Sequence, residues 1–214
     1  MKWITSFSNS QIPYYIYKLN KGDKILYNPN KIYSKSIIVL HGVIYLFKVF
    51  QNKEIFPLAI LKTNHIIDLN YYYETQHYYT IIALDKTYLM SFSLLEIKNK
   101  IYIKKQILFN IIHGQKSTLR QYELMNQILK HKYIKYRILQ LILLLSLEFG
   151  IIHDNKIIIP FSLSQKSLSI ITGSNKVTIN EIMSYLSKKT IIKYSTKKII
   201  HIENIFNLQL LFCY

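Results

Sequence analysis

The first half of the chain alternates short apolar runs with clusters of turn-forming residues. Between about residues 14 and 95 the runs are rich in β-branched and aromatic side chains. Such runs, separated by Gly, Asn, Pro and Asp, are typical of antiparallel strands in a sandwich or jelly roll. We therefore predict an N-terminal antiparallel β-barrel. The runs are YYIYKL, SIIVL, VIYLFKVF, FPLAIL, YYTIIAL and TYLMSF, and the turns between them include Asn20–Asp23 and Asn28–Asn30.

From about Leu94 the apolar positions recur with a period near 3.5, which predicts a long α-helix. The apolar stripe of this helix has two interpretations. It faces a second copy of the same helix, or it packs on its own domain. The pattern alone favours neither. The stripe consists of Leu108, Ile112, Gln115, Leu119, Tyr122, Asn126 and Leu129.

The C-terminal third predicts three helices followed by a hairpin. An apolar helix over Tyr133–Phe149 ends at Gly150, and Ser164 is a suitable N-cap for the next helix. Gly173 then separates two short amphipathic segments, as a helix–turn–helix requires, or lies in a loop between two core helices. The second segment predicts a helix over about 175–187. The sequence TIIKYSTKKIIHIE alternates around a turn and predicts a β-hairpin, which in this place would be a wing.

The net charge favours a polyanionic partner. Among 214 residues there are 28 Lys and Arg against 11 Asp and Glu, a formal charge of +17. Nucleic acid is the first candidate partner and an anionic membrane the second. Codon bias is an alternative cause, because the chain has only two arginines, Arg120 and Arg137, and is rich in Ile, Lys, Asn and Tyr. These residues have AT-rich codons, which indicates an organelle or a reduced bacterial genome as the source.

Several classes of protein are excluded by the same composition. Cys213 is the only cysteine, so we expect no intrachain disulfide, no cysteine-based zinc site and a reducing compartment. The seven histidines show no grouping of the kind that metal-dependent jelly-roll enzymes need, so we expect no metal, no cofactor and no enzymatic activity. The longest apolar run, Ile138–Phe149, is too short to span a bilayer, and the start lacks a signal-peptide pattern, so we expect no membrane partner.

The order of elements and the residues in them resemble the cyclic-AMP receptor/FNR family of transcription regulators, and within it the NtcA group of nitrogen regulators. In LSQKSLSIITGSNKVTINEIMSYLSKKTII a small and a basic residue follow Gly173, and a Val-Thr pair opens the second helix. YRILQLILLLSLEFGI, LNKGDKILYNPN and IIVLHGVIYLFKV are similar to other parts of that family. The resemblance implies an α+β fold in three parts. These are a cyclic-nucleotide-binding-like sensor barrel at 1–105, a dimerisation helix at 106–132 and a winged helix–turn–helix at 133–214.

The resemblance also implies a function. The chain would be a sequence-specific DNA-binding transcriptional regulator that acts as a homodimer on a palindromic promoter site of nitrogen-related genes. RNA polymerase is a further candidate partner. With the AT-rich composition, it implies a plastid-encoded protein of an alga, located in the chloroplast stroma, or otherwise in a bacterial cytoplasm. A second hypothesis is a small-molecule-binding regulatory module that gates a partner protein without reading DNA.

The resemblance places the DNA contacts on the second helix of the motif and around it. Lysine can donate to guanine, and a valine methyl can touch the thymine methyl. Glu181 stands where the family has an arginine that reads guanine, and a glutamate suits cytosine N4 instead. Each lysine of the wing, taken singly, has a second interpretation as a solvated surface charge. The expected base contacts are Lys176, Val177, Asn180 and Glu181, and the expected phosphate contacts are Ser164, Gln165, Thr178, Lys188, Lys197 and Lys198.

The expected effector site is altered relative to the family. The stretch IIDLNYYYETQHYYTIIAL lacks the arginine and glycine with which the family's cyclic-nucleotide barrels hold a cyclic phosphate, so we predict no response to cyclic AMP. NtcA-type barrels bind 2-oxoglutarate, and the matching positions here are His77, Thr118 and Glu123. Neutral His77 and Thr118 supply no cation for a dicarboxylate, so we predict weak or absent 2-oxoglutarate binding. The alternative for His77 is an ordinary surface histidine in a polar loop.

Overall fold

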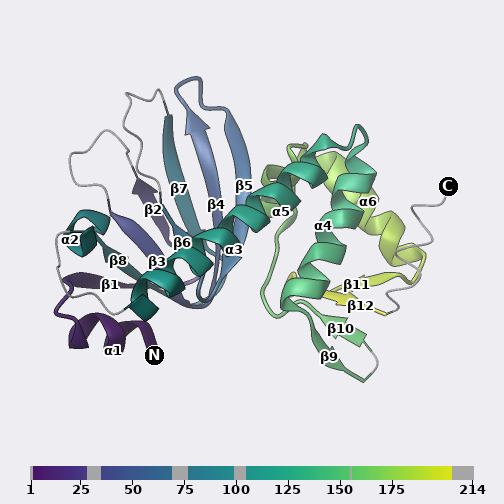
Figure 1. Cartoon of the computed structure of the whole chain (residues 1–214). Coiled ribbons are helices and arrows are strands. Elements are labelled where there is room, and N and C mark those ends of the chain that lie inside the picture. Colours follow the sequence, from purple (N-terminus) through teal and green to yellow (C-terminus); the bar gives the residue numbers. More distant parts are fainter. Residues whose placement is uncertain (1, 28–34, 69–76, 99–104, 155, 204–214) are drawn as a thin grey trace. The chain divides into compact units, whose positions relative to one another are not determined.

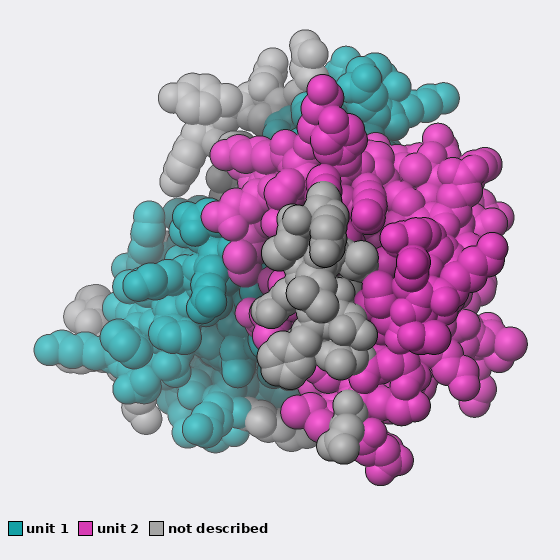
Figure 2. Space-filling view, turned by 90° about the vertical axis from the view of Figure 1, so that its right-hand side faces the viewer, with its two compact units in different colours: residues 1–123 teal, residues 124–214 magenta. Residues whose placement is uncertain are grey.

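The computed structural model describes residues 2–27, 35–68, 77–98, 105–154 and 156–203. The chain forms two compact units, unit 1 at residues 1–123 and unit 2 at residues 124–214, which Figure 2 shows in different colours. The predicted turn at Asn28–Asn30, and Cys213, lie outside the described residues. Within the described part of the chain, no helix combines the length and the apolar character that crossing a membrane requires.

Unit 1 is built from two four-stranded antiparallel sheets (Figure 1). The first has the strand order β1-β8-β3-β6 and the second β2-β7-β4-β5. All six predicted runs form strands, and the structure adds the short strands β2 and β6. The strands are β1 (Tyr14–Leu19), β2 (Lys24–Tyr27), β3 (Ser36–His41), β4 (Val43–Phe50), β5 (Ile55–Lys62), β6 (Ile66–Ile67), β7 (His77–Ala83) and β8 (Thr87–Phe92).

The core of unit 1 contains inward-facing side chains of both sheets. Ile37 and Val39 of β3 belong to the same buried cluster as Leu46 of β4 and Ile81 of β7. Ile38, which points to the other face of β3, is buried in a second cluster. A strand buried on both faces is apolar at consecutive positions, which explains why SIIVL is a continuous apolar run rather than an alternating one.

The outer face of the first sheet carries helices. These are α1 (Lys2–Asn9), α2 (Leu94–Lys98) and the first part of α3 (Lys105–Lys130). Trp3 and Phe7, one helical turn apart on α1, are buried in the outer cluster, where the Phe7 ring meets the Phe92 ring edge-on at 5.1 Å. Ile107 and Ile111 of α3 complete this cluster. Sequence analysis did not predict α1.

The long helix α3 is confirmed, and it buries a stripe next to the predicted one. Gly114 and Thr118 face β6, where a Cβ on Gly114 would lie 2.6 Å from the Ile66 side chain, so only glycine allows this close approach. The predicted stripe, one residue further on, stays largely exposed, with Ile112 at 64% and Leu119 at 58%. Tyr122 packs against the barrel core and is half-buried, as are Gln115 and Leu129. The side of α3 that packs on its own domain is therefore not the predicted stripe but the stripe next to it.

Unit 2 begins with the last turns of α3 and continues through three further helices. They are α4 (Ile134–Phe149), α5 (Gln165–Thr172) and α6 (Lys176–Lys188), and Gly150 ends α4 as predicted. Strands β9 (Ile151–His153), β10 (Lys156–Ile158), β11 (Ile192–Tyr194) and β12 (Ile200–Ile202) form a sheet in the order β11-β12-β10-β9. The predicted hairpin is the pair β11 and β12, and β9 was not predicted.

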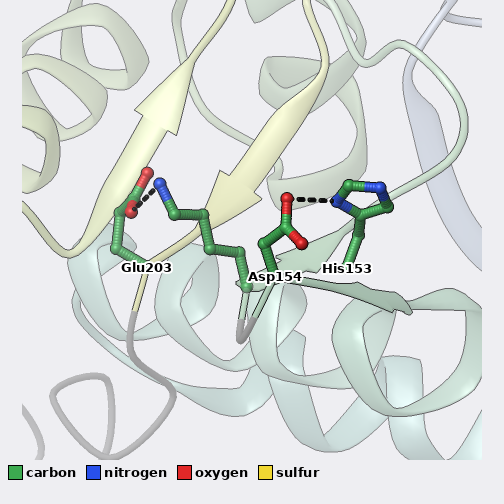
Figure 3. A network of polar contacts seen from close by, with 4 residues as sticks. His153, Asp154 and Glu203 are labelled. Carbon is green, nitrogen blue, oxygen red and sulfur yellow. Dashed lines mark ion pairs between the residues drawn. The ribbon is translucent and has the colours of Figure 1, made fainter.

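Ion pairs lie along the small sheet of unit 2 (Figure 3). Lys156 Nζ of β10 lies 2.7 Å from Glu203 Oε2, just after β12, and so links the neighbouring strands. His153 Nδ1 lies 2.9 Å from Asp154 Oδ2 in the turn that follows β9. All four side chains are partly or fully exposed, so we expect each pair to contribute little to stability.

Candidate nucleic-acid interface

The first helix of the motif, α5, begins as its sequence predicts. The Ser164 hydroxyl oxygen accepts a hydrogen bond from the Ser167 backbone N–H at 2.9 Å, which satisfies one of the unpaired donors at the helix start. Leu168 and Ile171 are fully buried and fix the inner side of the helix. Gln165, on the first turn, is half-buried.

The turn between the two helices requires glycine for its backbone conformation. Gly173 has φ +63° in the left-handed region and ends α5, and the Ser174 N–H donates to the Ser169 carbonyl at 2.9 Å. Arg137 of α4 donates from Nη1 to the Thr172 carbonyl at 2.9 Å and from Nε to the His131 carbonyl at 2.8 Å. One of the two arginines of the chain thus ties α4 to the end of α5.

The second helix, α6, is capped and anchored on one side. The Asn175 side-chain oxygen accepts from the Thr178 backbone N–H at 2.8 Å, so Asn175 is the N-cap, which sequence analysis did not assign. Ile179, Met183 and Leu186 are buried and hold the helix against the rest of unit 2. The helix matches the predicted range of about 175–187.

The predicted base-contacting residues share one exposed side of α6. Lys176, Val177, Asn180 and Glu181 are all exposed, and their spacing of one and four residues puts them on adjacent turns of the same side. Val177 is 68% exposed, so its methyl groups do not belong to the core. Ser184 is exposed one turn further on, and sequence analysis missed it although its spacing from Asn180 gave the signal.

A hydrogen bond joins the two helices at this surface. Gln165 Nε2 of α5 donates to Asn180 Oδ1 of α6 at 2.7 Å. Sequence analysis assigned these residues separately, Gln165 to phosphate and Asn180 to a base. The structure brings them together, so the Gln165 amide holds the Asn180 amide in one orientation, with its nitrogen left to donate outward.

The wing is attached to the segment that leads into α5. Tyr194 of β11 donates its hydroxyl to the Leu163 carbonyl at 2.6 Å, and burial raises the pKa of this phenol. Lys197 and Lys198 are exposed in the turn between β11 and β12. Lys188, the last residue of α6, is exposed too, while Thr178 is half-buried behind the cap. Unit 2 as a whole carries twelve Lys and Arg against four Asp and Glu.

The residues of the predicted effector site have other surroundings. His77 is half-buried at the start of β7 rather than in a loop, and its Nε2 lies 3.2 Å from the Tyr79 hydroxyl. Its pKa lies below the ordinary 6.5, because burial and then the charge of Lys48 disfavour the imidazolium. His77 is therefore a strand residue and not part of a polar loop, and its side chain stays partly exposed.

Thr118 is only 3% exposed, and its hydroxyl is used inside unit 1. It donates to the Gly114 carbonyl at 3.1 Å and accepts from the Ile66 backbone N–H at 3.1 Å. Glu123, five residues further along α3, is exposed, roughly 140° around the helix from Thr118. The structure therefore does not direct these two side chains to a common point.

Comparisons with known proteins identify relatives that are transcription regulators. No protein-family model matches the chain. The chain is 30% identical over 200 residues to a protein of Porphyra purpurea named as the HTH-type transcriptional regulator ycf28, with 92% of this chain and 82% of that protein covered. It is 24% identical over 195 residues to the global nitrogen regulator of Synechococcus elongatus, with 89% and 87% covered.

Among solved structures, the chain resembles a transcriptional regulator of the CRP/FNR family from Thermus thermophilus. The TM-score is 0.67 at 17% identity, and the alignment covers 92% of this chain and 97% of the other. At this identity the likeness establishes the fold. It confirms the predicted α+β architecture of barrel, long helix and helix–turn–helix.

Proposed function

The chain belongs to the family of HTH-type transcriptional regulators that includes ycf28, and from this premise we propose that it reads a palindromic DNA site as a homodimer. The members of this family are regulators rather than enzymes. One observation carries the proposal. The exposed side of α6 presents Lys176, Val177 and Asn180 together, on a helix whose other side is buried and whose start is capped. A helix fixed in this way can enter the major groove without rearranging.

Each of the four predicted base-contacting residues of α6 offers a different contact to a base edge. Lys176 donates to guanine O6 and N7, and Val177 meets a thymine methyl. Asn180, oriented by Gln165, donates to an acceptor, and Glu181 accepts from cytosine N4. Ser164, Gln165, Thr178, Lys188, Lys197 and Lys198 contact phosphates, which positions the helix but carries no sequence information.

The dimer forms through α3. Leu108, Ile112 and Leu119 are large apolar side chains on a helix surface that unit 1 leaves exposed, and the neighbouring Phe109 is 64% exposed. A second copy related by a two-fold axis would cover them and place two α6 helices for two half-sites. Residues 106–132 then act as the dimerisation helix, between a sensor barrel at 1–105 and a DNA-binding domain at 133–214.

The barrel does not respond to cyclic AMP and binds 2-oxoglutarate weakly or not at all. For cyclic AMP the reason is the missing arginine and glycine in the stretch that would hold the cyclic phosphate. For 2-oxoglutarate the reason lies in the surroundings of Thr118 and His77. Thr118 uses its hydroxyl to hold α3 on β6. Burial and the charge of Lys48 disfavour the protonated form of the His77 imidazole and lower its pKa. Neither supplies the charged donors that replace lost water around a buried carboxylate.

The relatives support a proposal for the target genes and the cell compartment. The likeness to global nitrogen regulators of cyanobacteria supports nitrogen-related promoters, with RNA polymerase as a further partner. The relative from a red alga and the AT-rich composition support a plastid-encoded protein of the stroma.

Selection of binding sites from random DNA, followed by fluorescence anisotropy on the selected palindrome, tests the DNA-reading proposal. Lys176→Ala should weaken specific binding by about 1–3 kcal/mol and relax the preference at one base of each half-site. Lys197→Ala should weaken binding to all sequences alike and reduce the salt slope by about one unit. Lys24→Ala, an exposed barrel lysine, is the control and should change nothing. Unchanged base preference in Lys176→Ala would mean that α6 does not read the site.

A further inference from the structure

A cavity of about 810 Å³ lies on the outer face of the first sheet of unit 1, beside α1. This volume is within the range of small-molecule sites in proteins, about 300–1,000 Å³. Its floor consists of strand residues, and one wall is the start of α1. The lining residues are Lys2, Trp3, Ile4, Ile16, Leu40, His41, Thr63, Asn64 and Tyr88.

The register of the sheet explains why the cavity exists. Across β1, β8 and β3, three rows of paired residues face outward, and α1 covers them unequally. The first row is covered, because Phe7 packs on Tyr14 and Phe92. In the second row Ile16 is still 46% exposed, and the third row is open. The rows are Tyr14–Phe92–Ser36, Ile16–Met90–Ile38 and Lys18–Tyr88–His41.

The wall of the cavity is fixed in position. Trp3 Nε1 donates to Asn64 Oδ1 at 2.9 Å, which joins α1 to the turn between β5 and β6. Phe7, one turn further along α1, meets the Phe92 ring of β8 at 5.1 Å. Because these two contacts tie α1 to the barrel, α1 does not slide over the open rows, and the apolar floor remains accessible.

Two lysines lie beside Tyr88, one of the residues that line the cavity. Lys86 Nζ lies 5.9 Å from the centre of the Tyr88 ring, and Lys18 is paired with Tyr88 across the strands. Lys2 belongs to the lining itself, and none of the nine lining residues within the described part of the chain is acidic. The neighbouring carboxylate, Asp85, accepts a hydrogen bond from the Lys86 backbone N–H at 2.8 Å. An apolar floor that ends in cations is complementary to a molecule with an apolar body and one anionic group.

We propose that this cavity binds an amphipathic monocarboxylate, such as a medium-chain fatty acid, with its chain on Ile16 and Leu40 and its carboxylate near Lys86 and Lys18. A neutral apolar molecule would leave the cations without a role. A peptide strand would need unpaired backbone groups, which lie at sheet edges and not on this face. The site lies within unit 1 and does not depend on DNA reading.

Calorimetric titration of the full-length protein without DNA tests the proposal, with decanoate, 1-decanol and butyrate as probes. Decanoate should bind saturably with one molecule per chain. Decanol lacks the charge and should bind about tenfold more weakly, and butyrate should not bind detectably, since each buried CH₂ contributes about 0.8 kcal/mol. Equal affinities for decanoate and decanol, or uptake of many molecules per chain, would overturn the proposal.

Variants locate the site. Ile16→Glu puts a like charge on the floor and should abolish decanoate binding, whereas Tyr15→Glu adds the same charge to the other face of β1 and should leave binding unchanged. Lys18→Gln with Lys86→Gln should weaken decanoate binding and leave decanol binding unaltered. Full decanoate affinity in a folded Ile16→Glu protein would contradict the assignment. A second outcome would also contradict the assignment. If the protein binds anionic phosphatidylglycerol vesicles through Ile16 but does not bind decanoate, the face is a membrane-binding surface.

Discussion

Units 1 and 2 use their polar side chains in opposite ways at the positions where the family resemblance implies ligand contacts. In unit 2, Lys176, Asn180 and Glu181 are exposed on one side of α6. In unit 1, Thr118 is buried with its hydroxyl used twice, and His77 packs beside aromatic rings. These three residues of unit 2 can meet a ligand while the buried side of α6 stays packed, whereas Thr118 and His77 are part of the fold of unit 1.

Net charge does not distinguish the two units. Unit 1 carries sixteen Lys and Arg against seven Asp and Glu, so its net charge of +9 is close to the +8 of unit 2. Much of the lysine excess therefore lies outside the proposed DNA-binding domain, as a composition bias predicts. The placement of lysines on α6 and in the wing is a better indication of DNA binding than their number.

The largest expected effect comes from α3, which both units share. Replacing Ile112 and Leu119 with Glu should give monomers in sedimentation, because like charges would meet across the two-fold axis. Binding to a palindrome should fall by at least about a hundredfold, since the two half-sites would no longer be bound together. Gln106→Glu with Ser117→Glu adds the same charge on another side of α3 and should leave the dimer intact. A double variant of the stripe that stays dimeric would place the interface elsewhere.

Removing the Thr118 hydroxyl tests whether unit 1 needs it for folding. Thr118→Val should destabilise unit 1 by about 1–3 kcal/mol, because the buried Ile66 N–H loses its acceptor. Native-state hydrogen exchange should show faster opening around β6 and unchanged exchange in α6. Thr118→Ser keeps the hydroxyl and serves as the control. Unaltered protection in the Val variant would leave Thr118 free for another role.

The corresponding test in unit 2 is Gly173→Ala. A residue with a Cβ in the left-handed region costs roughly 1–2 kcal/mol, and the space around Gly173 is otherwise sufficient. The exchange of α5 and α6 amides should accelerate, with β6 unaffected. Affinity for DNA per folded dimer should change less than in Lys176→Ala. An equal loss of protection in both units would show that they unfold together, and the comparison would fail.

The smallest effect concerns His77. Nuclear magnetic resonance titration should give it a pKa below 6.5, and Lys48→Gln should raise that pKa by removing the neighbouring charge. Since the unfolded chain takes up this proton first, acidification below about pH 6.5 favours unfolding. His77→Gln identifies the resonance. A pKa of His77 above 6.5 would instead indicate an acidic neighbour. His77 could then bind an anion, but only in its protonated form.

Sequence patterns predicted much of the fold, because strand runs and helix caps depend on neighbouring residues. Ser164, Gly150 and the six long strands are in this class. They could not predict α1, since the burial of Trp3 and Phe7 also depends on residues distant in the sequence such as Phe92. Nor could they show that α3 has two adjacent stripes, one packed on β6 and one exposed. The same limit applies to the site, where the exposed row on α6 follows from spacing but the Gln165–Asn180 bond depends on how two helices pack.

The hydrogen bond between Trp3 and Asn64 has an optical consequence. The chain has one tryptophan, Trp3, and nineteen tyrosines. The Trp3 indole is therefore the sole source of fluorescence at long wavelength, and it receives energy from the tyrosine phenols around it. Its ring is buried at the edge of the cavity beside α1. The emission spectrum of the unlabelled protein therefore reports on one contact, the docking of α1 on the barrel. A shift to the red at unchanged far-ultraviolet circular dichroism would mark its release while the rest of the chain stays folded.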